Sequence, residues 1–308
     1  MDPLPQLPAL DRATLTPLVR QALRSEAVEI VDWHTTPINF QGGGSTWRSV
    51  YRVVGTGHDG SKVVAWSLIL KALRGPIRAV SPGNEATQWA YWKREAMVYR
   101  AGLLDDLPDG LAAPRCFGVV EYPSEVLWIW LEEVVDTVGA PWPLARYGLA
   151  ARHLGGFNGA YLAGRPMPAY PWLSQDWLRS RTAFFAEGMP FLQCSSTWEH
   201  PLVRRAFPPP VVDRLLWLFE ERETFLRALA RLPKTLCHLD AWHGNLFAGS
   251  LPTVGSRRWP SIGPLSAVPP WGKRPACSCG RACKSSRLPG QRGAAGRERL
   301  RELPGGAP

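Results

Sequence analysis

The spacing of hydrophobic and polar positions predicts a strand-rich first half of the chain. Residues 13–33 have the pattern of a helix followed by a strand. Apolar and polar positions alternate after a glycine-rich turn within residues 40–54, which is typical of a β-hairpin. Residues 63–71 and 126–131 are further apolar strands. Between them, residues 85–103 place Trp, Ala and Tyr side chains on one face, which predicts a helix.

The second half of the chain changes to a helical pattern. Residues 144–163 and 211–231 repeat apolar side chains at intervals of three and four, as amphipathic helices do. The pattern breaks near residues 135–143, around the segment TVGAP. We therefore predict an α+β protein with a small β-rich N-terminal lobe, a helical C-terminal lobe and a disordered tail. The expected bounds are 1–135, 136–249 and 250–308.

One short segment of the helical half carries groups suited to phosphoryl transfer. It reads CHLDAWHGNLF, and its spacing H-x-D-x-x-x-x-N is typical of the catalytic loop of protein-kinase-like enzymes. Asp240 could accept the proton of a substrate hydroxyl, and Asn245 could ligate Mg²⁺ without adding a negative charge. His238 would brace the loop backbone, and Gly244 would permit the tight approach before Asn245. A polar loop between two helices is the alternative explanation.

Groups that could bind a nucleotide occur upstream, in the order that a kinase-like N-terminal lobe requires. Gly42, Gly43 and Gly44 lie at the hairpin tip, where backbone amides could approach phosphates. Lys71 ends a strand, where it could hold phosphates and pair with Glu95 of the next helix. Each feature alone also fits an ordinary turn or a solvated charge, so the joint order carries the prediction.

These segments resemble the aminoglycoside phosphotransferase and choline kinase-like family, small-molecule kinases with a protein-kinase-like bilobal fold. The resemblance spans about residues 20–249 and rests on GGGSTWRSVYRV, WSLILK, KREAMVYRAGLL, WLEE and CHLDAWHGNLF. It implies ATP and Mg²⁺ as cofactors and a small-molecule hydroxyl as phosphate acceptor. The implied catalytic residues are Asp240 and His238, the metal ligand is Asn245, and the nucleotide contacts are Gly42, Gly43, Gly44, Lys71, Glu95, Glu132 and Glu133, the last two near the adenine edge. Where the family usually has a small residue, this chain has Leu239.

The tail of the chain lacks a carboxylate that the family needs. The family has a second metal-binding Asp roughly 15–25 residues after the Asn, whereas residues 248–308 contain no Asp. Residues 251–308 hold nine Arg, two Lys and two Glu, so nearly all of the net charge of +10 lies there. Many Pro and Gly residues and few aromatic ones predict a disordered tail. Three cysteines in this tail, at C-x-C-x3-C spacing, make a poor zinc site.

A shifted reading frame explains the abrupt change near residue 250. When the codons of residues 258–264 are read one base earlier, they permit Val-Ala-Ile-Asp-Trp-Ala, the apolar-Asp-Trp pattern that the family has there. The Ala is forced, and the fifth position is limited to Trp or Arg. We therefore predict that the residues from about 250 onward are an out-of-frame translation of a phosphotransferase C-terminus. The alternative is a genuine tail rich in Arg and Pro, which could bind RNA.

The sequence thus predicts an ATP-dependent phosphotransferase that acts on a small-molecule hydroxyl and is impaired by the missing Asp. The alternative is a catalytically dead nucleotide-binding pseudoenzyme whose basic tail recruits an acidic partner. No run of about 18 apolar residues occurs, and the N-terminal segment MDPLPQLPALDRATL lacks the apolar stretch of a signal peptide. We expect a cytoplasmic protein with neither a membrane nor a nucleic-acid partner.

Overall fold

The computed structural model divides the chain into two compact units, Met1–Gly272 and Lys273–Pro308. The second unit lies outside the residues that the structure describes, so all that follows concerns the first. The described residues are 10–38, 48–75, 85–87, 91–108, 110–123, 125–136, 139, 141–186, 188–241, 244–249 and 259–262. The predicted glycine-rich hairpin tip, with Gly42, Gly43 and Gly44, is outside them.

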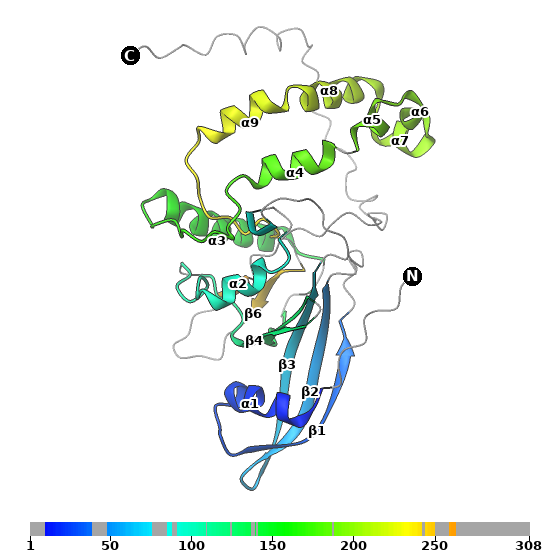
Figure 1. Ribbon diagram of the computed structural model, residues 1–308. Coiled ribbons are helices and arrows are strands. Elements are labelled where there is room, and N and C mark those ends of the chain that lie inside the picture. The colour runs from blue at the N-terminus through cyan, green and yellow to red at the C-terminus, as the bar shows by residue number, and fades with distance from the viewer. Residues whose placement is uncertain are drawn as a thin grey trace. The chain divides into compact units, whose positions relative to one another are not determined.

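A five-stranded antiparallel sheet forms the first half of the described chain, with the strand order β1-β2-β3-β5-β4. The strands are β1 (Val28–Pro37), β2 (Arg48–Asp59), β3 (Lys62–Arg74), β4 (Cys116–Tyr122) and β5 (Val126–Glu132). Figure 1 shows the long β2–β3 hairpin beside β1. This hairpin turns through Gly60, whose φ of 62° suits a two-residue loop between Asp59 and Lys62. The sheet confirms the predicted strands, but β3 continues three residues past Lys71, which the sequence places at the end of its strand.

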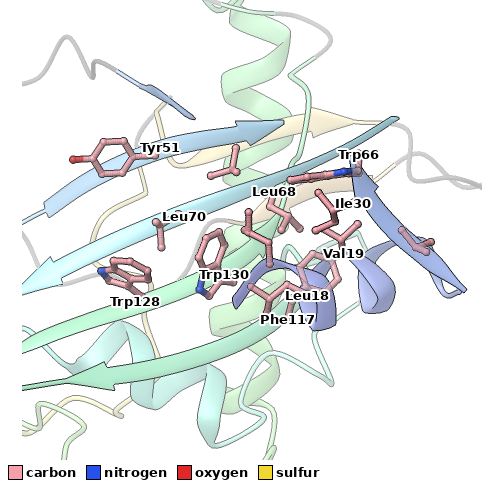
Figure 2. Close-up of a cluster of buried hydrophobic side chains, with 13 residues drawn as sticks. Leu18, Val19, Ile30, Tyr51, Trp66, Leu68, Leu70, Phe117, Trp128 and Trp130 are labelled. Carbon is pink, nitrogen blue, oxygen red and sulfur yellow. The ribbon is translucent and has the colours of Figure 1, made fainter. Parts of the chain in front are cut away.

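One face of the sheet packs against α1 (Arg12–Leu23). Burial alternates along β3, where Trp66, Leu68 and Leu70 are buried. These side chains form one cluster with others from β1, β2, β4, β5 and α1. Figure 2 shows Leu18 and Val19 of α1 within this cluster. Alternation of period two therefore builds this layer of the core.

The opposite face of the sheet packs against α2 (Arg94–Arg100). Ala96 of α2 lies in a cluster with Leu73, Leu127, Ile129 and Leu131. Because helices cover both faces, β5 is buried at five successive positions and shows no alternation. The helix expected over residues 85–103 is shorter, since the structure has a 3₁₀ turn, η1 (Glu85–Thr87), and then α2.

Helices follow the sheet, as the pattern of period 3.6 predicts. They are α3 (Leu144–Leu162), α4 (Trp177–Ala186), α5 (Met189–Gln193), α6 (Ser195–Glu199), α7 (Pro201–Ala206), α8 (Pro209–Glu220) and α9 (Arg222–Ala230). The single helix expected over residues 211–231 is interrupted at Glu221, which separates α8 from α9. None of the described helices combines the length and the apolar character needed to cross a membrane. The protein is thus of the mixed α+β class, and α3–α9 follow the five-stranded sheet in the chain.

A short second sheet follows the helices. It pairs β6 (Leu246–Gly249) with β7 (Trp259–Ile262) in antiparallel register, with Leu246 opposite Ile262. The sequence does not predict β7, because residues 250–308 are expected to lack regular structure. Backbone pairing explains the difference, since a strand partner for β6 needs main-chain groups and little from the side chains. The rest of that tail lies outside the described residues.

Candidate functional site

A buried ion pair joins the sheet to α2. Lys71 lies in the middle of the sheet, where β3 pairs it with Val50 on one side and Ile129 on the other. Its Nζ is 2.7 Å from Oε1 of Glu95, and the Glu95 side chain is only 1% exposed. The pair that the sequence predicts between Lys71 and Glu95 is therefore present. It holds the Lys71 ammonium in one place, which is what a phosphate-binding lysine requires.

The surroundings of Glu95 are shielded from water. Burial, and then the Glu95 carboxylate, hold the pKa of the Tyr99 hydroxyl well above its ordinary value. Burial likewise raises the pKa of the Cys116 thiol, and the same carboxylate adds to that effect. Both groups therefore stay protonated and neutral near pH 7, and they add no charge beside the Lys71–Glu95 ion pair.

The segment that follows α9 gathers the three predicted loop residues. His238 is buried, and its Nδ1 accepts a hydrogen bond from the backbone amide of Asp240 at 3.2 Å. The Asn245 side-chain amide donates to the Asp240 carbonyl at 2.9 Å and to its Oδ2 at 2.8 Å. These bonds close the loop around Asp240 and fix its carboxylate. With the amide nitrogen turned to Asp240, Oδ1 is the atom of Asn245 that could ligate a cation.

Leu239 occupies an unfavourable backbone conformation within this loop. Its φ is 62°, in the left-handed region where a side chain normally costs about 1–2 kcal/mol. Its side chain is exposed, so little packing offsets this cost. The family that the sequence resembles usually has a small residue here, and glycine is the residue that adopts this φ without strain.

Helix α3 contacts the chain both before and after the loop. Before the loop, Thr235 Oγ1 donates to the Asn158 carbonyl at 2.6 Å. After it, Nη2 of Arg146 donates to the Leu246 carbonyl at 3.2 Å. Leu246 itself lies in a buried cluster that also contains Leu236 and residues of α2 and α3. The sequence did not single out Arg146, because an arginine in the first turn of a helix normally points to solvent.

Helix α2 links the two groups of residues. Its Glu95 pairs with Lys71, and one turn later its Val98 packs in the same cluster as Leu236 and Leu246, which flank the loop. A buried side chain of α2 adds a polar contact, since Nε of Arg94 donates to the Trp172 carbonyl at 2.9 Å. The Lys71–Glu95 pair and the Asp240 loop are thus connected through one seven-residue helix.

The two glutamates expected near an adenine base are engaged by arginines. Glu132 Oε2 accepts a hydrogen bond from the Arg115 amide at 3.1 Å and lies 3.6 Å from its guanidinium. Glu133 Oε1 is 2.7 Å from Nε of Arg52. The structure brings neither carboxylate to Lys71 or Asp240.

Two side chains of the loop carry oxygen atoms of the kind that could ligate a magnesium ion. Asn245 Oδ1 and the Asp240 carboxylate are oxygen donors of the kind that Mg²⁺ prefers. Within the part of the chain that the structure describes, no group of three or more His, Cys, Asp and Glu side chains is placed to hold a metal ion. The donor chemistry fits Mg²⁺, and the set lacks a second carboxylate.

Comparisons with other proteins leave the family open. No family model and no curated protein matches this chain. The resemblance to the phosphotransferase family therefore rests on the motif residues and on the contacts described above.

Proposed function

We propose that this protein has a protein-kinase-like bilobal fold and is an ATP-dependent phosphotransferase that acts on a hydroxyl of a small molecule. The observation that carries the proposal is the loop in which Asp240 is bonded to both His238 and Asn245. The Lys71–Glu95 pair in the same compact unit adds the group that would hold the phosphates. Lys71, Glu95 and the Asp240 loop follow one another in the same order as their counterparts in kinase-like enzymes.

Each residue has a distinct role in the proposed reaction. The acceptor hydroxyl oxygen attacks the γ-phosphorus of ATP while Asp240 accepts the hydroxyl proton. The bond from the γ-phosphorus to the bridging oxygen breaks, and ADP leaves with that electron pair. Lys71 donates hydrogen bonds to phosphate oxygens, and Glu95 keeps its ammonium in position. His238 acts through the backbone of Asp240 and does not touch the substrate.

Asn245 would hold Mg²⁺ through Oδ1, and that cation would neutralise negative charge on the phosphates. Its Nδ2 meanwhile keeps the Asp240 carboxylate oriented through the bond at 2.8 Å. One side chain thereby positions both the base and the cation. Replacing Asn245 would disturb both functions at once.

The register of the second sheet supports the prediction that the chain is impaired. Pairing with β6 places residue 262 opposite Leu246, next to the Asn245 position. The shifted frame reads its Asp from the last base of the Ser261 codon and the first two bases of the Ile262 codon. The position at which the shifted frame permits an Asp is therefore the one that β7 pairs with Leu246. In the sequence as written, an isoleucine stands there.

The incomplete donor set favours one alternative, a nucleotide-binding pseudoenzyme. Lys71 and Glu95 would still hold phosphates in such a protein, and the basic tail would recruit an acidic partner. The coding DNA separates the two proposals. An impaired phosphotransferase predicts a single-base insertion or deletion near codons 247–256, followed by an alternative reading frame without stop codons. The pseudoenzyme predicts that the reading frame as written is uninterrupted.

Turnover of a frame-restored chain tests the proposed reaction. ADP release is measured with an aminoglycoside, choline and homoserine as acceptors. Asp240→Asn should lower the rate by about 10²-fold or more, the scale of a general base. The matched control is Asp213→Asn, because Asp213 is exposed on α8, and it should keep the full rate. Equal rates in Asp240→Asn and the control would remove Asp240 from the mechanism.

A further inference from the structure

Arg146 is a buried cation with two polar partners, one ten residues before it and one a hundred residues after it. Its Nη1 is 2.7 Å from Oδ1 of Asp136, and its Nη2 donates to the Leu246 carbonyl at 3.2 Å. Its guanidinium lies 4.2 Å from the ring centroid of Trp142. Only 6% of the Arg146 side chain is exposed. The Arg146 guanidinium thus combines an ion pair, a hydrogen bond to a carbonyl and a contact with an aromatic ring.

The two partners belong to segments that the proposed function places at the site. Asp136 follows the end of β5, four residues after Glu132, in the segment expected to meet the nucleotide base. Leu246 comes directly after Asn245, the proposed magnesium ligand. One guanidinium thus joins the backbone next to the metal ligand to the segment next to the base.

Helix stability does not explain this position. Arg146 lies in the first turn of α3, which has no acidic residue, and a cation there opposes the helix dipole. Burying a charged group also costs free energy unless its partners are well placed. The arrangement stabilises a particular geometry of the two segments, since a hydrophobic side chain would fill the same space without these costs.

We infer that Arg146 is a positioning residue that fixes the Asn245 side chain through the Leu246 carbonyl and couples it to the segment after β5. The inference rests on the proposed function for its meaning and on the contacts above for its geometry. If the Leu246 carbonyl moves, the adjacent Asn245 moves with it. Its two bonds to Asp240 then lengthen, and the carboxylate loses its orientation.

Arg146→Lys tests this role directly. A lysine keeps the charge for Asp136 but lacks the planar fork that reaches the carbonyl and stacks on Trp142. Loss of a hydrogen bond from a charged donor should speed amide exchange of residues 244–247 about tenfold or more. The NMR signal of the Asn245 side-chain amide, assigned by its loss in Asn245→Ala, should shift or broaden.

The chain offers a matched control at the other end of α3. Arg165 follows that helix, pairs with Asp106 at 2.6 Å and lies 5.4 Å from the Tyr161 ring. Arg165→Lys therefore removes a fork from an Asp pair and from an aromatic ring without touching Leu246. It should leave the exchange of residues 244–247 and the Asn245 signal unchanged. Equal effects of the two substitutions would show a merely structural role.

A second variant keeps the inference testable if Arg146→Lys fails to fold. Asp136→Asn retains Arg146 and its bond to Leu246 but removes the ion pair, so it should give a smaller change in the same direction. The positioning role is overturned if Arg146→Lys folds and leaves the amide exchange and the Asn245 signal unaltered. Asp136→Asn decides in the same way if Arg146→Lys does not fold.

Titration of each variant with ATP and Mg²⁺ distinguishes the two proposals. A wild-type chain that binds no ATP contradicts the proposed function, while exchange and NMR still decide the role of Arg146.

Discussion

Individual residues of the Asp240 loop are held by bonds that the sequence motif alone does not specify. His238 is buried, and its ring nitrogen accepts a hydrogen bond from the Asp240 backbone amide, which helps to shape the loop. The side-chain amide of Asn245 donates to both the carbonyl and the carboxylate of Asp240. Leu239 is the unfavourable member, because its φ is 62°. The loop is therefore closed around its carboxylate at the expense of strain at one position.

Leu239→Gly should relieve that strain. The substitution removes the cost of the left-handed conformation from the folded state. Glycine also gives the unfolded chain more conformational freedom, which offsets part of this gain. The free energy of unfolding should therefore rise by about 1 kcal/mol. The control Leu239→Ala removes the same exposed side chain but keeps Cβ, and it should give no gain. Urea unfolding midpoints measure both. An equal rise in the alanine variant would mean that the side chain, and not the backbone, was unfavourable.

Breaking the Lys71–Glu95 pair should cost more than neutralising it. Lys71→Ala removes the ion-pair partner of a carboxylate that is 1% exposed, which should lower the free energy of unfolding by about 3 kcal/mol. The double variant Lys71→Met, Glu95→Gln keeps the volume of the two side chains but removes both charges. It should lower the free energy of unfolding clearly less. A double-mutant cycle in urea measures the coupling. If the costs of the single variants simply add, the two charges do not interact.

At the scale of elements, α2 is the piece that couples the two groups of site residues. The ion pair lies on its first turn, and Val98 packs into the cluster that contains Leu236 and Leu246. A loss of packing at Val98 should therefore be felt in the loop as well as in global stability.

Val98→Ala should lower the free energy of unfolding by about 2 kcal/mol, from lost burial and a small cavity. It should also speed amide exchange in residues 236–246 more than in α1. Val63→Ala is the control, because Val63 is 72% exposed on β3, and its cost should stay within about 0.5 kcal/mol. Unaltered exchange in the loop would contradict the link through α2.

The sequence predicts elements best where one periodic pattern decides them. Alternation around Trp66 and Leu68 predicts the sheet, and the place of Lys71 before a helix with Glu95 predicts their pairing. The features that were not predicted from the sequence depend on tertiary contacts. Arg146 is buried because the segments before and after the helical region supply its partners, and β7 forms because its main chain pairs with that of β6. Neither cause is visible in a local pattern.

At the scale of the whole molecule, the helices after α3 bury little apolar surface. Among the described side chains, α4–α9 contribute three buried hydrophobic ones, Met189, Val212 and Leu226, as many as the twelve-residue α1 contributes alone. Phe191 and Leu202 are more than 70% exposed in the same region. A C-terminal sequence in the shifted reading frame, as predicted, would offer these side chains a segment to pack against.

Restoring the shifted frame should cover part of this surface. Each apolar side chain that becomes buried adds about 1.5–3 kcal/mol, so the melting temperature should rise and binding of the dye bis-ANS should fall. A chain cut after residue 262 keeps β7 and should melt at the same temperature as the chain as written. A large loss of stability on this cut would show that residues 263–308 are a folded, selected part of the protein.

Calorimetric titration with ATP in the presence of Mg²⁺ tests the central claim most directly, because it needs no knowledge of the acceptor. The chain as written should bind ATP, and the volume-conserving pair Lys71→Met and Glu95→Gln should weaken binding about tenfold or more through loss of a charged hydrogen-bond donor. Lys62→Met removes an exposed lysine from the same strand and should leave the affinity unchanged. No binding by the chain as written, or equal affinity in all three proteins, would contradict the account.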